Sequence, residues 1–86
     1  MNLPFFIVRE KAFVKRHPEL VERYKKILRL LELNPSHPSL KLYKLKGRFS
    51  DKHAVSITYA YRIVITLIVA DNEIIFIDIG HHGEVY

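Results

Sequence analysis

The chain has 86 residues, of which 49% are hydrophobic and 27% are charged, and it contains no cysteine. This length suits one compact domain spanning residues 1–86, and the composition is globular rather than disordered. Without cysteine there is no disulfide framework, no thiolate nucleophile and no Cys-based zinc or iron–sulfur site. The apolar start reaches Arg9 too soon for a signal peptide, and no apolar run has membrane-spanning length, so we expect a cytoplasmic protein.

Positive charge is concentrated in the middle of the chain. The formal net charge is +5, and residues 1–40 hold eight basic and four acidic residues. Residues 63–86 hold four acidic residues and no basic one, whereas residues 41–62 contain one acidic residue, Asp51, and six basic ones: Lys41, Lys44, Lys46, Arg48, Lys52 and Arg62. Clustered Lys and Arg with a pI near 9.6 are typical of a surface that meets phosphate. A solvated basic face, or a surface for an acidic protein partner, would give the same pattern.

The first half of the chain predicts helices. Phe5 to Val8 is interpreted as a short strand and Glu10 to Lys15 as a short helix. From Pro18, which suits a first helical turn, apolar residues recur at spacings of three and four: Leu20, Tyr24, Ile27, Leu28 and Leu31. This pattern predicts the longest helix, which ends at Asn34-Pro35. The two prolines between Asn34 and Pro38 indicate a loop.

The second half predicts a meander of antiparallel strands. Val55 to Thr58 alternates apolar and polar residues, Tyr61 to Val69 is β-branched, Asp71-Asn72 is a turn, and Ile74 to Ile79 returns as a buried strand. If Phe5 to Val8 joins the same sheet, the order is β-α-α-β-β-β. The fold class is then α+β, an antiparallel sheet with two N-terminal helices packed on one face.

The hairpin brings two distant parts of the sequence together. A two-residue loop at Asp71-Asn72 sets Arg62 opposite His81, and a three-residue loop sets it opposite His82. A one-residue slip exchanges the faces of the strand, so the pattern does not choose between the two histidines. If the preceding loop folds back over the same face, it adds three basic side chains: Lys44, Lys46 and Arg48.

These residue types suit RNA cleavage without a metal. Such cleavage needs a base for the ribose 2′-OH, a cation for the phosphate and an acid for the departing 5′-oxygen. Arg62 suits the second role, and His81 or His82 suits the first or third. Tyr86 could orient a 2′-OH or stack on a base, and His53, just ahead of a predicted strand, is a further candidate.

No metal site is expected. Adjacent residues on a strand point to opposite faces, so His81-His82 is a poor chelate, and only Asp78, Glu84 or His53 could complete it. Tyr59 and Tyr61 flank a bend and are interpreted as ordinary packing. His17 and His37 lie beside prolines at helix boundaries and are interpreted as structural.

Three motifs resemble the RelE/ParE superfamily of bacterial and archaeal toxins: Lys44-Leu45-Lys46-Gly47-Arg48, Tyr61-Arg62-Ile63-Val64, and the ending from Gly80 to Tyr86. The resemblance spans nearly the whole chain. It implies that Arg62 contacts the scissile phosphate, as in the RelE and YoeB branches. It also implies that His82 and Tyr86 complete the site, since their spacing from Gly80 matches YafQ-like members, and it favours His82 over His81.

The chain also departs from these branches. The first lysine position of RelE falls near His53, the next inward position is Val55, and the glutamate that YoeB carries ahead of the glycine corresponds to Tyr43. The general base therefore stays open between His53 and His82. The resemblance is compatible with phosphate-binding roles for five basic residues: Lys44, Lys46, Arg48, Lys52 and His81.

The function that the resemblance implies is that of a type II toxin–antitoxin system. Members of this type cut mRNA in the ribosomal 30S A site, use no metal or organic cofactor, and are neutralised by an antitoxin protein. Two alternatives stay open. One is a ParE-like, non-enzymatic poison of DNA gyrase, and the other is a nucleic-acid-binding module without catalysis.

Overall fold

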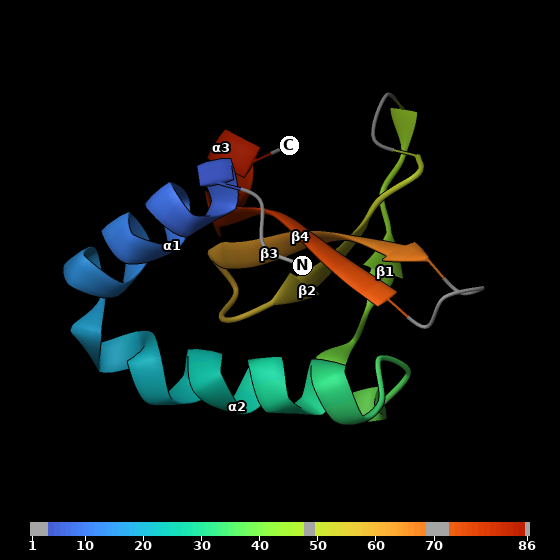
Figure 1. The fold of residues 1–86 in the computed structure, drawn as a ribbon, viewed down its shortest axis with the longest axis horizontal. Coiled ribbons are helices and arrows are strands. Elements are labelled where there is room, and N and C mark those ends of the chain that lie inside the picture. The colour runs from blue at the N-terminus through green and yellow to red at the C-terminus, as the bar shows by residue number, and fades with distance from the viewer. Residues whose placement is uncertain (1–3, 48–49, 69–72, 86) are drawn as a thin grey trace.

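The computed structural model describes residues 4–47, 50–68 and 73–85. Two long helices, α1 and α2, come first, and a four-stranded sheet follows (Figure 1). The elements in chain order are α1 (Pro4–Arg16), a 3₁₀ turn (Pro18–Leu20), α2 (Val21–Leu33), a second 3₁₀ turn (Pro38–Leu40), β1 (Tyr43–Lys44), β2 (His53–Ser56), β3 (Tyr61–Ile68), β4 (Glu73–His81) and α3 (His82–Val85). Among the described residues, no helix is long and apolar enough to cross a membrane.

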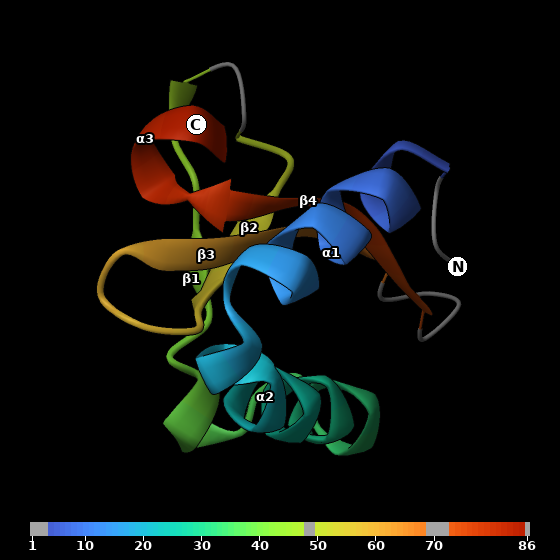
Figure 2. The same cartoon turned by 90° about the vertical axis from the view of Figure 1, so that its left-hand side faces the viewer.

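The sheet is antiparallel throughout, with its strands in the order β1-β2-β3-β4. The helix α1 lies against the edge strand β4, and α2 runs beneath the sheet (Figures 1 and 2). Side chains of both helices join one core cluster with residues of β2, β3 and β4. The predicted fold class, α+β with two N-terminal helices on one face of an antiparallel sheet, is therefore confirmed.

The two faces of the sheet differ in what they bury. The helix-covered face carries Val55, Ile63 and Ile65, all fully buried against α1 and α2. Full burial of one such side chain stabilises the fold by about 1.5–3 kcal/mol. The outer face carries Arg62 and a smaller cluster of Leu45, Ala54 and Val64. Because side chains alternate along a strand, Arg62 and Ile63 project to opposite faces.

The prediction of a strand at Phe5 to Val8 is wrong, because these residues belong to α1. Phe6 and Phe13, seven residues apart, are the buried residues of this helix, and their spacing of about two turns puts them on one side. The ring of Phe6 packs on that of Phe76 in β4 at 5.2 Å. Four consecutive apolar residues carry no period, so the sequence pattern could not show that only one face of this segment is buried.

A partly buried hydrogen bond joins α1 to α2. The hydroxyl of Tyr24, which is 3% exposed, donates to the carboxylate of Glu10. Burial first, and then the bond to Glu10, raise the pKa of Tyr24 well above that of an ordinary tyrosine. The helix predicted from Pro18 is confirmed as a 3₁₀ turn that continues into α2, with Tyr24, Ile27 and Leu31 as its buried stripe.

The predicted register of the β3–β4 hairpin is wrong. Arg62 pairs with Gly80, not with His81 or His82, and His81 pairs with Tyr61. Four residues separate the paired Ile68 and Glu73, a pairing that alone would set Arg62 opposite Ile79. An irregularity in β4 opposite Val64 and Ile65 then moves the partner of Arg62 to Gly80. An extra residue at such a bulge shifts every later pair by one position. The predicted turn at Asp71-Asn72 lies outside the described residues.

Candidate functional site

Arg62 lies near the start of β3, on the outer face. Its Nε donates to the Tyr43 hydroxyl at 3.1 Å, and its Nη1 donates to the backbone carbonyls of Thr58 and Tyr61. All three acceptors are neutral, and no ion pair among the described residues involves Arg62. Its Nη2 has no hydrogen bond to the described residues. The guanidinium is therefore fixed in place while its charge and two N–H donors remain available to an anion.

Two tyrosines flank this guanidinium. Tyr43, in β1, pairs with Ala54 of β2 and is 36% exposed. Tyr59, 88% exposed, has its ring centroid 5.9 Å from the Arg62 Cζ. Exposed aromatic rings beside a cation can stack on unpaired bases. The motif analysis placed Tyr43 only as a departure from YoeB and interpreted Tyr59 as packing, so it missed both as parts of the site.

The turn between β2 and β3 accepts hydrogen bonds from both Arg62 and the start of α3. The Thr58 carbonyl accepts from Arg62, and the Ala60 carbonyl accepts from the His82 backbone N–H at 2.9 Å. His82 is exposed, and its ring stacks on that of His81 with 4.6 Å between centroids. The structure therefore brings Arg62 and His82 to the same end of the sheet. Tyr86, the third predicted member, lies outside the described residues.

His53 and Arg62 point to opposite faces of the sheet. His53 in β2 pairs with Lys44 of β1 and with Ile65 of β3. Since Ile65 belongs to the helix-covered core, directly paired His53 points toward that face, whereas Arg62 points to the outer face. The His53 Nδ1 is buried and has no hydrogen-bond partner among the described residues. His53 and Arg62 do not therefore meet around one group on the outer face.

The predicted phosphate-binding residues are dispersed. Lys44 and Lys46 are exposed along and just after the edge strand β1. Lys52 donates to the carboxylate of Asp51 at 3.1 Å, and this hydrogen bond lowers the pKa of Asp51. His81, paired with Tyr61, points to the helix-covered face. Arg48 lies outside the described residues.

No group of three or more His, Asp or Glu side chains in the described part of the chain could hold a metal ion. The rings of His81 and His82 stack on one another with 27° between their planes. The His81 Nδ1 accepts a hydrogen bond from the Gly83 backbone N–H at 3.2 Å, which engages that nitrogen locally. The chemistry available at this end of the sheet is that of a fixed guanidinium, imidazoles and phenols.

Comparison with known proteins identifies the fold. No protein-family model matches the chain, and no curated protein matches it by sequence. YafQ from E. coli strain BL21(DE3) superposes with a TM-score of 0.84 at 18% identity, covering 99% of this chain and 93% of that one. The YoeB/ParE toxin from Agrobacterium tumefaciens gives 0.78 at 18%, covering 95% and 96%. The heterotetrameric YoeB–YefM toxin–antitoxin complex from Staphylococcus aureus gives 0.75 at 22%, covering 95% and 93%.

The matched region is nearly the whole domain, so the likeness extends well beyond the sequence motifs. It includes both N-terminal helices and the four-stranded antiparallel sheet on which Arg62 is placed. The chain therefore has the RelE-like α+β fold that is shared by the YafQ and YoeB toxins of the RelE/ParE superfamily.

Proposed function

We propose that the chain is the toxin of a type II toxin–antitoxin system and that it cleaves mRNA on the ribosome. The observation that supports this proposal is how the Arg62 guanidinium is bonded. Its guanidinium is held by Tyr43 and Thr58, has no ion pair among the described residues, and lies at the same end of the sheet as His82. The RelE-like fold and the three sequence motifs support the same function.

The proposed reaction is attack of a ribose 2′-oxygen on the adjacent phosphorus. A base removes the 2′-OH proton, the new O–P bond forms, the bond from phosphorus to the 5′-oxygen breaks, and an acid protonates that oxygen. The products are a 2′,3′-cyclic phosphate and a 5′-OH end. Arg62 stabilises the charge on the phosphate through the Nη2 donors that the described residues leave unbonded, because a fixed guanidinium needs no reorganisation during the reaction.

We assign proton transfer to His82 rather than His53. Imidazole changes charge near neutral pH, which suits it to donate and accept protons. His82 is exposed at the end of the sheet that holds Arg62, whereas His53 points to the other face. For Tyr86 we propose a role in orienting the 2′-OH or in stacking on a base.

The partners proposed are the 30S A site, its mRNA and an antitoxin protein. Exposed Lys44 and Lys46 would hold phosphates of rRNA or mRNA beside the site. A solved YoeB forms a toxin–antitoxin complex with YefM. An acidic segment of an antitoxin would complement the net charge of +5. We propose no metal or organic cofactor for the reaction.

Programmed ribosomes provide the test. Purified protein is incubated with ribosomes that hold a defined codon in the A site, and the mRNA ends are mapped. The wild type is expected to cut within that codon, and Arg62→Ala and His82→Gln should each lower the rate by about 10²-fold or more. Arg29→Ala, which removes an exposed guanidinium from α2, is the matched control and should cut normally.

The alternative functions predict different outcomes of the same experiment. Intact mRNA together with inhibited supercoiling by DNA gyrase would contradict the proposal in favour of a gyrase poison. RNA binding without any cleavage would point to a binding module. Thermal unfolding of each variant separates loss of activity from loss of fold.

A further inference from the structure

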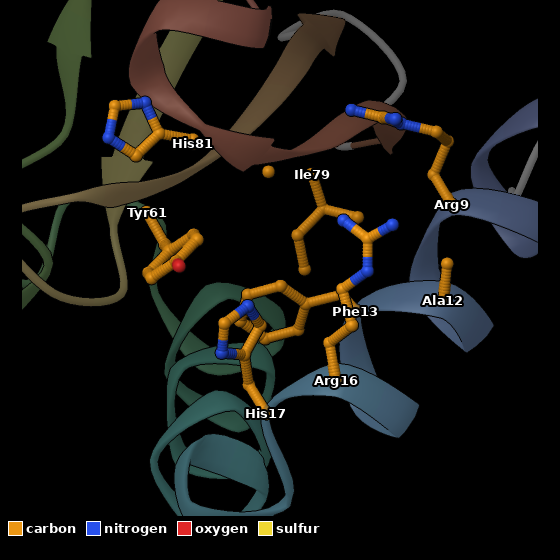
Figure 3. Close-up of a pocket in the computed structure, with 9 residues that line it drawn as sticks. Arg9, Ala12, Phe13, Arg16, His17, Tyr61, Ile79 and His81 are labelled. Carbon is orange, nitrogen blue, oxygen red and sulfur yellow. The ribbon is translucent and has the colours of Figure 1, made fainter.

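A cationic recess lies on the helix-covered face, between α1 and the ends of β3 and β4. Its cavity volume is about 40 Å³, and it is lined by Arg9, Ala12, Phe13, Arg16, His17, Tyr61, Ile79, Gly80 and His81 (Figure 3). Two guanidiniums, two imidazoles and a phenol are gathered there, and none of the lining residues is acidic. This donor set is suited to an anion.

Of the two arginines that line the recess, Arg16 is the one without an ion pair among the described residues. It is exposed at the end of α1. Figure 3 shows its guanidinium pointing from the helix toward Ile79 of β4. Arg9, by contrast, uses its Nε to bind the Asp78 carboxylate at 2.8 Å, which leaves its Nη groups as the donors. The positive charge of Arg16 is therefore the one most available to a ligand.

Imidazole rings line the other side of the recess. His17 packs on Tyr61 at 4.5 Å, and Tyr61 meets His81 edge-on at 5.9 Å. His17 also has Glu19 near its Nδ1 at 3.5 Å. Because the His81 Nδ1 accepts from the Gly83 N–H, its Nε2 carries the proton in the neutral ring and can donate to an anion.

The recess is connected to the proposed active site. His81 lines it, and the ring of His81 stacks on that of His82. The successive residues Tyr61 and Arg62 project to opposite faces of β3, so the recess and the Arg62 guanidinium flank one end of the sheet.

We propose that this recess binds a further phosphate of the RNA strand whose scissile phosphate is held by Arg62. The proposal rests on the proposed function and adds a second phosphate subsite to it. A volume of about 40 Å³ corresponds to roughly three water-sized positions, which suits the tetrahedral oxygens of one phosphate better than an extended side chain. Arg16 supplies a charge that no ion pair among the described residues uses, and His81, which also lines the recess, supplies a hydrogen-bond donor.

The salt dependence of RNA binding tests the subsite. The probe is a short 2′-O-methyl RNA, which cannot be cleaved by 2′-OH attack, and its affinity is measured by fluorescence anisotropy over a series of salt concentrations. The plot of log K against log salt has a negative slope, and each lost phosphate contact on a single strand reduces the magnitude of that slope by about 0.7. Arg16→Ala and Arg16→Gln should both show this loss, which is about a fivefold weaker affinity at 0.1 M salt.

Lys15→Ala is the matched control. Lys15 is exposed in the same last turn of α1 and carries the same charge, but it does not line the recess. It should keep the wild-type slope. Equal slopes for the Arg16 and Lys15 variants would overturn the subsite, even if Arg62→Ala abolishes cleavage and so upholds the proposed function.

The opposite pattern separates the two proposals. If the wild type cuts no mRNA on ribosomes yet Arg16→Ala still lowers the slope, the proposed function fails while the phosphate subsite stands. An acidic peptide of the same length is the competing probe. Peptide binding that falls in Arg16→Ala, with RNA binding unchanged, would overturn the subsite in favour of a contact with an acidic protein.

Discussion

Arg62 and Ile63 are neighbours in β3, and they differ in burial, in charge and in the face of the sheet to which they point. Ile63, on the helix-covered face, is fully buried among side chains of both helices. Arg62, on the outer face, is held by a phenol and backbone carbonyls and keeps an unpaired charge among the described residues. One strand thus stabilises the fold with one set of side chains and presents chemistry with the other. A change at either residue should affect one property and spare the other.

The largest effect is expected for Ile63→Ala. Removing a fully buried isoleucine side chain costs about 2–5 kcal/mol, a large part of a typical unfolding free energy of about 5–15 kcal/mol. Urea unfolding followed by circular dichroism measures it. Arg62→Ala should shift the unfolding midpoint little. Similar losses for the two variants would contradict the division between the faces.

High pH should lower the unfolding free energy through Tyr24, the residue of α2 that bonds to Glu10 of α1. Because the pKa of Tyr24 is raised in the folded protein, only the unfolded state releases this proton above pH about 10. Stability should then fall by up to about 1.4 kcal/mol per pH unit above that value. Unfolding free energies from pH 9 to 11 test this. Tyr24→Phe should remove that part of the slope, and Tyr59→Phe, at an exposed site, should leave it unchanged.

The Tyr43 hydroxyl should have a moderate effect on cleavage. Tyr43→Phe keeps the ring but removes the acceptor of the Arg62 Nε. A hydrogen bond of about 0.5–1.5 kcal/mol corresponds to roughly a two- to tenfold lower cleavage rate. Cleavage kinetics on programmed ribosomes give the value. Tyr59→Phe serves as the comparison, because the Tyr59 hydroxyl makes no hydrogen bond within the described part of the chain. A rate equal to wild type for Tyr43→Phe would show that this hydroxyl does not position Arg62.

The smallest effect concerns the ion pair of Arg9 and Asp78 beside the recess. Both side chains are partly exposed, so solvent screening limits their coupling to about 0.5–1 kcal/mol. A double-mutant cycle with Arg9→Ala and Asp78→Ala, measured by urea unfolding, isolates this coupling. A coupling near zero would mean that Asp78 does not stabilise the charge of Arg9, which would then be as available to a ligand as that of Arg16.

Helical periodicity predicted α2, which buries one stripe, and β-branched composition predicted the long strands of the second half. In β3, Val64 and Ile65 are buried on opposite faces of the sheet, so burial there has no period of two. Tyr24, Ile27 and Leu31 follow the helical period and are buried. The N-terminal segment could not be assigned in this way. Phe6 is 1% exposed, while its neighbours Phe5 and Val8 are 60% and 66% exposed. A run that is apolar on every side of a helix has the composition of a strand.

The sequence motifs selected candidate residues for the site but did not give its geometry. Arg62 and His82 do lie at one end of the sheet, as the motifs indicated. The faces were not predictable, because a register shift of one residue reverses them and the irregularity in β4 has no sequence signal of its own. The contact of Tyr43 with Arg62 could not be predicted either, because it depends on the pairing of the two-residue strand β1 with β2.

The most direct test of the proposed cleavage by Arg62 and His82 uses the substrate itself. The cleavage position is first mapped on programmed ribosomes, and the mRNA is then made with a single 2′-deoxynucleotide on the 5′ side of the scissile phosphate. Attack by the 2′-OH predicts that this mRNA stays intact at that position, while the unmodified mRNA yields a 2′,3′-cyclic phosphate and a 5′-OH end. Cleavage of the deoxy-substituted mRNA at the same position would contradict the proposed chemistry.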